Sequence, residues 1–490
     1  MSHTPHPKTA AAAPDAGPSD LSADPAGALM INVITIETPS LGDRSYLISD
    51  GTVAVVVDPQ RDTDRVTELA AERGVRITHV LETHIHNDYV TGGHALAEQV
   101  GAAYCVNAED EVSFERTPLR DGEEFRTGDL VVRVLATPGH TFTHLSYAVS
   151  LASSAGDADQ GTVVFTGGSL LYGSTGRPDL LGAEHAEALA RHQHASAHRL
   201  VEELPDDTEI YPTHGFGSFC AATPTSGDSA TIGSQKTDNP ALTQGVEEWV
   251  EATLAALTAH PAYYAHMGPA NASGPAPVDL SQPAPADAAE LRRRIEAGEW
   301  VVDLRDRTSY AAGHVPGTFN FGQDGSFITY LGWLIPWGTP VTLLASTPDD
   351  VEAAQRDLAR IGIDRPAAVA TGAVPDWIDG GGEPAGFGTV DFTDVAARRR
   401  DGQDPLVLDV RRDDERAAGY VTGSTHIPLH GLLERLDEVP SDRPVLVHCA
   451  SGYRASIAAG VLDRAGVDVV LIDDSFDNAA TAGLDIEKDA

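Results

Sequence analysis

A duplicated segment in the C-terminal half constrains the fold of this 490-residue chain more than any other feature. One copy occupies residues 302–317 and begins V-D-L-R, and the other occupies residues 408–423 and begins L-D-V-R. Each ends in a segment that starts A-A-G and closes on a glycine, and the two copies keep a constant offset of 106 residues. Chance rarely holds one register over so many identities, so the pattern predicts two copies of one domain.

Two stretches rich in glycine and other small or turn-forming residues divide the chain and predict its linkers. The N-terminal residues are rich in Ala, Pro, Asp and Ser, lack the apolar core of a signal peptide, and predict a disordered tail. The resulting organisation is a tail at 1–29, a first domain at 30–267, a linker at 268–285, a second domain at 286–379, a linker at 380–388 and a third domain at 389–490.

Short runs of β-forming residues alternate with helical patterns in the first domain. Helical patterns cover residues 64–73 and 94–100. Strands are expected at residues 31–36, 45–49, 53–57, 77–81, 131–135, 145–149 and 163–165. This mixture is typical of a layered α/β domain.

The charge of the chain limits its partners. It has 33 basic and 73 acidic residues, a net charge of −40, and lysine only at positions 8, 236 and 488. Such a surface repels phosphate backbones and anionic membranes, so we expect neither nucleic acid nor membrane as a partner. Three cysteines fit a reducing compartment, and no apolar run approaches the ~20 residues of a membrane span. We therefore expect a soluble cytoplasmic protein and leave a homo-oligomer open.

A cysteine follows a strand-like run in the second copy of the repeat. The run V-L-V-H ends at Cys449, a short loop with Gly452 follows, and a helical pattern starts at residue 455. This geometry aims backbone N–H groups and a helix N-terminus at the sulfur, which lowers a thiol pKa and stabilises an anion. Arg454 adds a fixed positive charge. Its spacing from the cysteine leaves little room for the phosphate that the longer phosphatase loop holds.

The sequence C-A-S-G-Y-R at 449–454 resembles the active loop of rhodanese-type sulfurtransferases, whose cysteine carries a persulfide. The resemblance implies that Cys449 and Arg454 are catalytic and that Ser451, Gly452 and Tyr453 bind the substrate. Aligning the first copy of the repeat on the second puts Ala345 at the position of the cysteine. A methyl group cannot hold transferable sulfur, so the first copy is expected to be an inactive rhodanese kept for packing or docking.

Histidines at predicted strand ends indicate a metal site in the first domain. Residues 84–89 read H-I-H-N-D-Y, directly after a β-rich run. Three more motifs follow strand-like runs: T-P-G-H-T at 137–141, F-T-G-G-S-L-L at 165–171 and Y-P-T-H-G at 211–215. Ligands distant in sequence can converge at such strand ends.

These motifs, together with G-R-P-D-L at 176–180, resemble the metallo-β-lactamase superfamily and most closely its persulfide dioxygenases of the glyoxalase II branch. The resemblance covers about residues 31–267. It implies an αββα sandwich followed by two rhodanese-like α/β domains, the order of persulfide dioxygenase–sulfurtransferase fusions. It also places Arg177 beside the substrate.

The chain departs from the ligand set that this resemblance implies. The family's iron ligands map onto His84, His140 and an aspartate position that is Gly168 here. The second-metal ligands of dinuclear relatives map onto Asp88, His214 and a histidine position that is Tyr89 here. We therefore expect one metal ion, iron(II) or zinc, held by His84, His86 and His140, with Asp88 and His214 binding directly or orienting these ligands.

Three hypotheses follow for function. The first is a sulfur-metabolism enzyme that oxidises a low-molecular-weight persulfide, such as glutathione persulfide, to sulfite, while Cys449 exchanges sulfane sulfur among sulfite, thiosulfate and thiol persulfides. The second is a zinc-dependent hydrolase of thioester-type substrates fused to a sulfurtransferase. The third is a sulfurtransferase whose first domain is a metal-free binding module.

Overall fold

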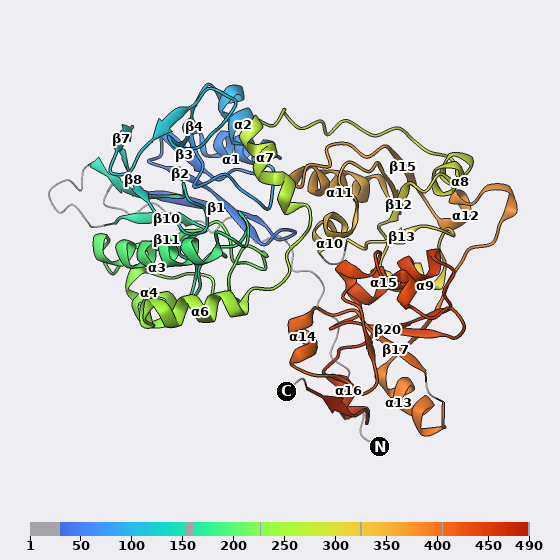
Figure 1. The fold of residues 1–490 in the computed structure, drawn as a ribbon. Helices are drawn as coiled ribbons and strands as arrows, with labels where there is room; N and C mark the ends of the chain where they lie inside the picture. Colours follow the sequence, from blue (N-terminus) through green and yellow to red (C-terminus); the bar gives the residue numbers. More distant parts are fainter. Residues whose placement is uncertain (1–29, 153–160, 226, 324–325, 404, 489–490) are drawn as a thin grey trace, which may run out of the picture.

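The computed structural model describes residues 30–152, 161–225, 227–323, 326–403 and 405–488, so the predicted disordered tail at 1–29 lies outside the described residues. Figure 1 shows three folded units in chain order: an N-terminal unit on the left, a second unit at the upper right and a third below it. We call them the first domain, the first repeat and the second repeat.

Two β-sheets form the centre of the first domain. One has the order β1-β2-β3-β4-β5-β6 and the other the order β11-β10-β9-β8-β7. The strands are β1 (Asn32–Thr38), β2 (Asp43–Ser49), β3 (Val53–Val57), β4 (Arg76–Leu81), β5 (Ala103–Asn107), β6 (Thr117–Leu119), β7 (Glu124–Thr127), β8 (Leu130–Ala136), β9 (Leu145–Leu151), β10 (Val163–Gly167) and β11 (Glu209–Pro212).

Alternating side chains explain why these sheets stack in layers. In β2, Tyr46 and Ile48 join the core between the two sheets, while Leu47 points to the opposite face and packs with the helices there. Successive residues of a strand face opposite sides, so a sheet with both faces apolar must be covered on both. The helices that accompany the sheets are α1 (Asp64–Arg73), α2 (Gly93–Val100), α3 (Ala186–Glu203), α4 (Ile232–Asp238), α5 (Pro240–Thr243), α6 (Val246–Ala256) and α7 (Tyr264–Ser273).

The helices cover the outer faces of the sheets and complete an αββα sandwich (Figure 1). Val66 of α1 and Leu96 of α2 pack on the first sheet, and Leu200 of α3 and Trp249 of α6 pack on the second. The predicted layered α/β fold is therefore confirmed. The layers bring the ends of β4, β8, β10 and β11 to one edge.

The two repeats are built on matching parallel sheets. The first has the order β13-β12-β14-β15, and the second contains the equivalent order β19-β17-β20-β21 with β16 added at its edge. In the first repeat the elements are α8 (Ala288–Glu296), β12 (Trp300–Asp303), α9 (Arg307–Ala312), β13 (Phe319–Asn320), α10 (Phe327–Leu334), β14 (Val341–Ala345), α11 (Pro348–Arg360), β15 (Ala368–Thr371), α12 (Val374–Trp377) and η2 (Asp379–Gly381).

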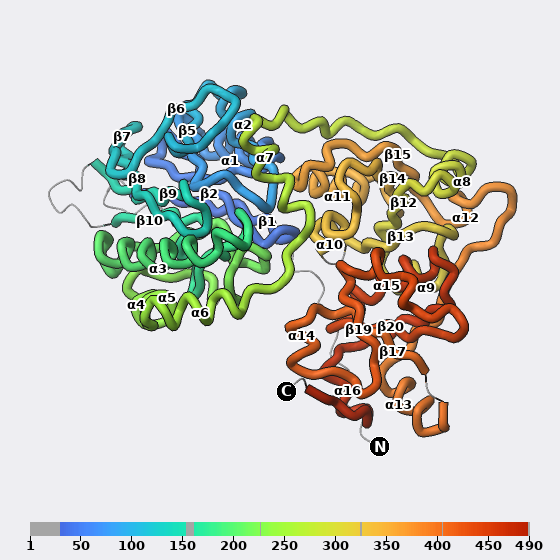
Figure 2. The backbone as a smooth tube through the Cα atoms, viewed as in Figure 1, coloured from blue at the N-terminus to red at the C-terminus, as the bar shows by residue number. Residues whose placement is uncertain are grey.

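The second repeat follows the same plan with extra short strands. Its elements are β16 (Gly388–Val390), α13 (Phe392–Arg400), β17 (Leu406–Asp409), α14 (Asp413–Ala417), β18 (Tyr420–Val421), β19 (Thr425–His426), η3 (Leu429–Gly431), η4 (Leu436–Glu438), β20 (Val445–His448), α15 (Tyr453–Arg464), β21 (Val469–Ile472), α16 (Asn478–Thr481) and β22 (Ile486–Glu487). The tube in Figure 2 places α15 beside α9, so the active-loop helix of the second repeat packs on the first repeat.

Strand register confirms the alignment of the repeats. Asp303 pairs with Leu344 in the first repeat, and Asp409 pairs with His448 in the second. Ala345 and Cys449 are the next residues along β14 and after β20, so they occupy the same place in the two sheets. The substitution inferred from the sequence is therefore a real replacement at the strand end.

The first domain is joined to the first repeat through charged contacts and a shared apolar core. Arg360 of α11 bonds Asp62 at 2.6 Å, Arg356 bonds Asp64 at 2.6 Å, and the backbone N–H of Val90 donates to the carbonyl of Arg360 at 2.7 Å. One cluster of buried apolar residues continues from the first domain through both repeats. The three units therefore pack as one assembly.

The predicted boundary at residue 267 falls inside helix α7, so residues 268–273 of the predicted linker are helical. Asn271 explains why this segment belongs to the domain. Its amide donates to the carbonyls of His86 at 2.9 Å and Tyr89 at 2.8 Å, and its carbonyl accepts from the N–H of Thr91 at 2.9 Å. The start of the predicted linker therefore supports the histidine loop.

Asn271→Ala should lower the unfolding midpoint of the protein. The substitution leaves two buried carbonyls and one buried N–H without their partner, and each such loss costs about 1–3 kcal/mol. Chemical denaturation followed by fluorescence measures the change. Asn271→Asp turns the donor into a carboxylate oxygen that faces two carbonyls, so it should cost at least as much. Equal midpoints for Asn271→Ala and wild type would contradict this role.

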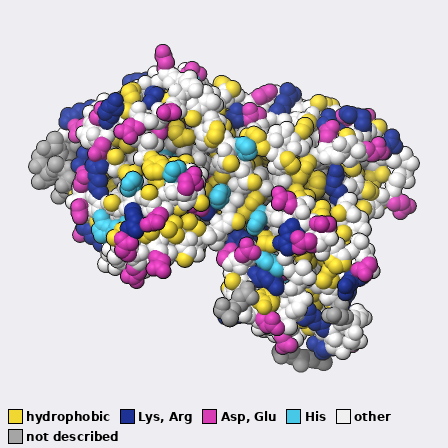
Figure 3. Space-filling view, in the orientation of Figure 1, with side chains coloured by type: hydrophobic (Ala, Val, Ile, Leu, Met, Phe, Trp, Pro, Cys, Tyr) yellow, Lys and Arg dark blue, Asp and Glu magenta, His cyan; other side chains and the backbone are white. Residues whose placement is uncertain are grey.

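The acidic residues are not gathered into one patch on the face of the molecule seen in Figure 3. Figure 3 shows acidic side chains spread over the viewed faces of all three units, with basic side chains among them. Among the described residues, the helices include none long and apolar enough to cross a membrane.

Candidate metal centre and cysteine loop

The histidine loop follows β4 and lies almost entirely inside the first domain. His84, His86 and Asp88 are each at most 2% exposed. Asp58 anchors the start of the loop, because its carboxylate accepts from both the N–H and the hydroxyl of Thr83 at 2.7 Å. The loop is therefore held rigidly between β3, β4 and α7.

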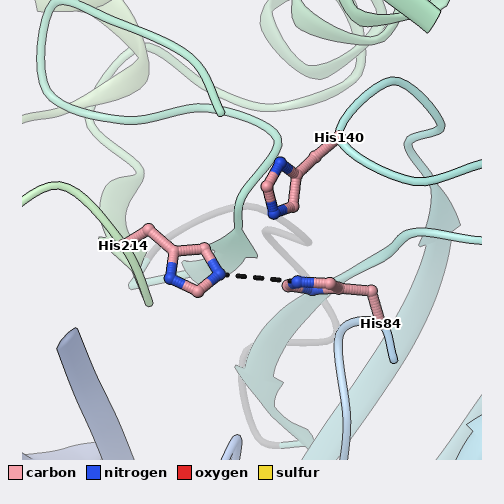
Figure 4. A group of neighbouring side chains, drawn as sticks. All are labelled: His84, His140 and His214. Atoms are coloured by element: carbon pink, nitrogen blue, oxygen red, sulfur yellow. Dashed lines mark hydrogen bonds between the residues drawn. The ribbon is translucent and has the colours of Figure 1, made fainter. Parts of the chain in front are cut away.

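Three histidines from three different strand ends converge (Figure 4). His84 follows β4, His140 follows β8 and His214 follows β11. The Nε2 atoms of His84 and His214 lie 3.4 Å apart, and the buried Nε2 of His140 has no hydrogen-bond partner among the described residues. One nitrogen from each of the three lies within 4.8 Å of the others, so together they could hold a metal ion.

The other ring nitrogen of each of these histidines faces an oxygen. His84 Nδ1 lies 2.9 Å from the hydroxyl of Thr83, which already donates to Asp58. His140 Nδ1 lies 2.9 Å from the carbonyl of Arg177. His214 Nδ1 lies 2.9 Å from a carboxylate oxygen of Asp43. Each Nδ1 must therefore donate, which leaves each Nε2 lone pair free for a metal.

Burial and charge set the protonation of this cluster. Burial lowers the pKa of His140 to about 3, and burial together with neighbouring imidazoles holds the pKa of His84 well below its usual value. For His214 burial also lowers the pKa, but the carboxylates of Asp88 and Asp43 outweigh it and raise the pKa. Neutral imidazoles are the form that binds metals, and a metal would displace the proton held at His214.

His86 is not grouped with His84 and His140, in contrast to the predicted set. Its Nε2 lies 3.2 Å from Asp58, 3.2 Å from Glu82 and 3.0 Å from the hydroxyl of Tyr89. Burial lowers the pKa of His86, but the two carboxylates outweigh it and raise the pKa to about 9. The Nε2 of His86 therefore faces these oxygens, and the group that joins His84 and His140 contains His214 where the sequence predicted His86. His86 does appear in two other candidate groups, with Asp88 and His214 and with Asp58 and Glu82.

Gly168 lies directly against the ring of His140. A Cβ added at Gly168 would lie 2.4 Å from Cδ2 and 3.0 Å from Nε2 of His140. The N–H of Gly168 donates to Nε2 of His144 at 3.0 Å, and the ring of His144 stacks on that of His84. The ring of His140 therefore fills the space of the carboxylate that the family resemblance implies.

Gly168→Asp should destabilise the protein and should not create a carboxylate ligand in the present arrangement. Overpacking of this kind costs about 1–3 kcal/mol. Chemical denaturation and metal content measure both effects. Gly245→Asp is the matched control, because a Cβ at Gly245 meets nothing within 4 Å. Tighter iron binding in Gly168→Asp than in wild type would show that His140 moves aside and would contradict the expectation.

The sequence predicted that Arg177 lies beside the substrate, but the structure buries it among protein partners. Its guanidinium is 2% exposed, pairs with Asp179 at 2.6 Å and 2.8 Å, and donates to the carbonyls of Phe219 and Thr258. All of these partners belong to the protein. Its carbonyl instead fixes the orientation of His140, so Arg177 positions a candidate ligand.

The cysteine loop keeps the geometry predicted from the sequence. Cys449 is buried directly after β20, and the N–H of Gly452 donates to its sulfur at 3.2 Å. Gly452 has a φ of +95°, which favours glycine, and helix α15 starts at the next residue. Arg454 is paired with Glu415 at 2.5 Å and 2.6 Å, so its charge is partly balanced within the protein.

The predicted substrate-binding residues of this loop have different positions. Ser451 is exposed, whereas the hydroxyl of Tyr453 donates to the carbonyl of Gly322 in the first repeat at 2.8 Å. Tyr453 therefore contacts the neighbouring repeat through its polar end. A small cavity beside Arg454 is lined on its other side by Tyr330 and Trp333 of α10.

Sequence reasoning did not single out several residues of the metal centre. His144, Asp58, Asp43 and Glu82 are all buried beside the predicted histidines. His144 had a usable signal, since it lies four residues after His140 in the same short segment. The carboxylates had none, because nothing in a single sequence shows that residues 43 and 214 meet.

Comparisons with known proteins agree with this architecture. Residues 43–214 match the family model of the metallo-beta-lactamase superfamily, and residues 287–379 and 392–482 match that of the rhodanese-like domain. The chain is therefore a fusion of one metallo-β-lactamase superfamily domain with two rhodanese-like domains, and the predicted fusion is confirmed.

The relatives of this fusion include sulfur-metabolism enzymes and hydrolases. The mitochondrial persulfide dioxygenase ETHE1 of Homo sapiens is 29% identical over 210 residues, which are 42% of this chain and 74% of that protein. The probable polyketide biosynthesis zinc-dependent hydrolase BaeB of Bacillus velezensis is 28% identical over 180 residues, 35% of this chain and 72% of that protein. A solved metallo-beta-lactamase structure from Staphylococcus aureus matches with a TM-score of 0.61 and 26% identity, covering 70% of this chain and 100% of that one. The similarity to the persulfide dioxygenase, together with the two rhodanese-like domains, supports the predicted assignment to sulfur metabolism.

Proposed function

We propose that the first domain binds one metal ion through His84, His140 and His214 and oxidises a low-molecular-weight persulfide, while Cys449 of the second repeat carries sulfane sulfur. The observation that carries the proposal is the convergence of three buried imidazoles whose Nδ1 atoms all face oxygen partners. The similarity to persulfide dioxygenases supplies the substrate class.

The donor set fits a metal of the kind that the family implies. Three imidazole nitrogens without a carboxylate suit iron(II) or zinc and leave coordination positions open. The unpartnered, buried Nε2 of His140 would otherwise cost free energy. Bound iron(II) would supply the redox chemistry with dioxygen, in which persulfide, dioxygen and water give thiol, sulfite and two protons.

The residues around the three histidines would keep this site in one geometry. Asp43 and Asp88 hold Nδ1 of His214, and the carbonyl of Arg177 holds Nδ1 of His140. Partners that orient metal-bound imidazoles change metal affinity by about 10–100-fold when removed. The burial of all three rings also excludes bulk water from the ligands.

The cysteine loop would carry out sulfur transfer in two steps. The Cys449 thiolate attacks the outer sulfur of a persulfide, so a new S–S bond forms and the thiolate of the donor leaves. Sulfite then attacks the outer sulfur of the Cys449 persulfide, which forms thiosulfate and returns the Cys449 thiolate. The Gly452 N–H and the Arg454 guanidinium stabilise negative charge on the sulfur in both steps.

Oxygen uptake with glutathione persulfide tests the first half of the proposal. Iron-loaded wild-type protein and the Cys449→Ser variant should both consume oxygen and release sulfite, whereas His84→Ala and His140→Ala should not. Oxygen uptake that is absent in wild type while sulfur transfer persists would leave the first domain as a metal-free binding module.

The three free cysteines, all buried, support a reducing cytoplasmic location.

A second candidate is a zinc-dependent hydrolase of a thioester-type substrate. The observation that favours it is the all-histidine donor set, which acidifies a zinc-bound water to near neutral pH in other proteins. The similarity to zinc-dependent and acylglutathione hydrolases points the same way. Hydrolysis of S-lactoylglutathione by zinc-loaded protein, without oxygen uptake by iron-loaded protein, would favour this candidate.

A further inference from the structure

Side chains at the boundary between the two repeats join the cysteine loop of the second repeat to the first repeat. The hydroxyl of Tyr453 donates to the carbonyl of Gly322 at 2.8 Å. The hydroxyl of Ser456 donates to the side-chain carbonyl of Asn320 at 2.6 Å. The guanidinium of Arg307 bonds Asp473 at 2.7 Å. We call these three contacts the loop clamp.

The loop clamp acts on the part of the loop that contacts the sulfur. Tyr453 and Ser456 lie in the first turn of α15, whose N-terminus follows the loop. Asp473 follows β21 and lies against Gly452, because a Cβ added at Gly452 would lie 2.1 Å from Oδ1 of Asp473. The same Cβ would lie 3.1 Å from Nε of Arg307. The first repeat therefore packs directly on the residue whose N–H bonds Cys449.

Charge gives Arg307 a specific role within the clamp. Asp473 places a negative charge beside a loop that must hold an anionic sulfur. A like charge disfavours a thiolate, and a paired arginine cancels much of that effect. Arg307 belongs to α9 of the first repeat, so the repeat without a cysteine supplies the cation that neutralises Asp473.

Other charged and titratable groups surround the cysteine loop. Arg454 and Glu415 form an ion pair that stays within the second repeat. Tyr330 of α10 interacts with Cys449, and His448 of β20 directly precedes it. Arg412, just before α14, and His430 of η3 line the cavity beside Arg454. None of these is altered when Arg307 is replaced, so the effect of Arg307 can be measured separately.

We propose that Arg307 and Asn320 of the inactive repeat are positioning residues for the sulfur-carrying loop, which hold the Gly452 N–H on Cys449 and keep Asp473 neutralised. The inactive repeat is then a working part of the sulfur-transfer site. This inference rests on the proposed role of Cys449, but its test reads the thiol itself and does not require turnover.

The pH dependence of Cys449 alkylation tests the proposal in the full-length protein. Iodoacetamide reacts with thiolate, and mass spectrometry of the peptide that contains Cys449 gives its rate at each pH. Arg307→Gln should slow the reaction of Cys449 roughly tenfold at neutral pH, because an unpaired Asp473 disfavours negative charge on the neighbouring sulfur. Arg307→Lys keeps a cation beside Asp473 and should restore most of the rate.

Asp463→Asn is the matched control. Asp463 pairs with His314 of the first repeat at 3.1 Å, so it belongs to the same interface but lies at the far end of α15. It should leave the alkylation profile unchanged. An unchanged profile in Arg307→Gln, or an equal shift in Asp463→Asn, would overturn the proposal.

A second variant covers the case in which Arg307→Gln fails to fold. Ser456→Ala removes one hydroxyl from the loop clamp and should slow alkylation of Cys449 several-fold at neutral pH, whereas an unchanged rate would overturn the proposal. Absence of thiosulfate-to-cyanide transfer in wild type would instead refute the proposed function of Cys449, and the alkylation profiles would still report on the clamp.

Discussion

Replacing His214 by alanine should lower the affinity of the first domain for its metal by more than about 100-fold. This loss exceeds the one expected when a residue that only orients a metal ligand is removed. His214 supplies one of three converging nitrogens, and its Nε2 lies 3.4 Å from that of His84. Competition with a chromophoric chelator measures the affinity for iron(II) and zinc separately.

His86→Gln provides the control for this prediction. Glutamine can still donate to Asp58 or Glu82, the carboxylates that Nε2 of His86 faces. The metal affinity of the variant should stay within about tenfold of the wild-type value, which is the smallest loss expected when a residue that orients a metal ligand is removed. Metal loss in His86→Gln together with retention in His214→Ala would instead favour the set of His84, His86 and His140 predicted from the sequence.

Replacing Cys449 by serine should reduce sulfur transfer from thiosulfate to cyanide by roughly 1,000-fold or more, as expected when a nucleophile is removed. Serine keeps the size of the side chain but cannot form a persulfide. Ala345 occupies the equivalent strand end in the first repeat and has no sulfur to take over this role. A colorimetric thiocyanate assay measures the rate.

Cys220→Ser is the control for this substitution. Cys220 is also buried, but it lies in the first domain, and burial holds its thiol pKa well above the usual value. The variant should keep sulfur transfer at the cysteine loop. Equal losses in Cys220→Ser and Cys449→Ser would mean that Cys449 is not the only sulfur carrier in this assay.

Local patterns in the sequence predicted most of the fold. The helix expected at residues 64–73 forms over those residues, and a strand forms at each of the seven expected positions in the first domain. These elements carry their own periodicity and caps, so no distant contact is needed to recognise them. The end of the first domain was predicted too early, because Pro269 and the neighbouring small residues are typical of a linker but lie in α7.

The candidate site was only partly predictable because its geometry depends on residues far apart in the chain. The motif H-I-H suggested that His84 and His86 bind together, yet Nε2 of His86 faces Asp58 and Glu82. Arg177 looked like a free cation in its motif, yet Asp179, Phe219 and Thr258 take up its hydrogen bonds. A motif identifies residue types, whereas competing partners decide which of them face the ligand.

The contacts between the two repeats were likewise not predictable from the sequence. The alignment predicted that Ala345 takes the place of Cys449 in the first copy, and the strand register agrees. Nothing in that alignment indicated that Arg307 and Asn320 reach the loop of the other copy. Contacts between domains leave no periodic signal in a single sequence, so they became visible only in the folded chain.

Metal content per chain tests the central claim most directly. The protein should be purified anaerobically after growth with both iron and zinc, and elemental analysis should be done on wild type, His84→Ala and His214→Ala. We predict close to one iron or zinc per wild-type chain and almost none in either variant. No bound metal in wild type, or undiminished metal in His214→Ala, would contradict a centre built from His84, His140 and His214.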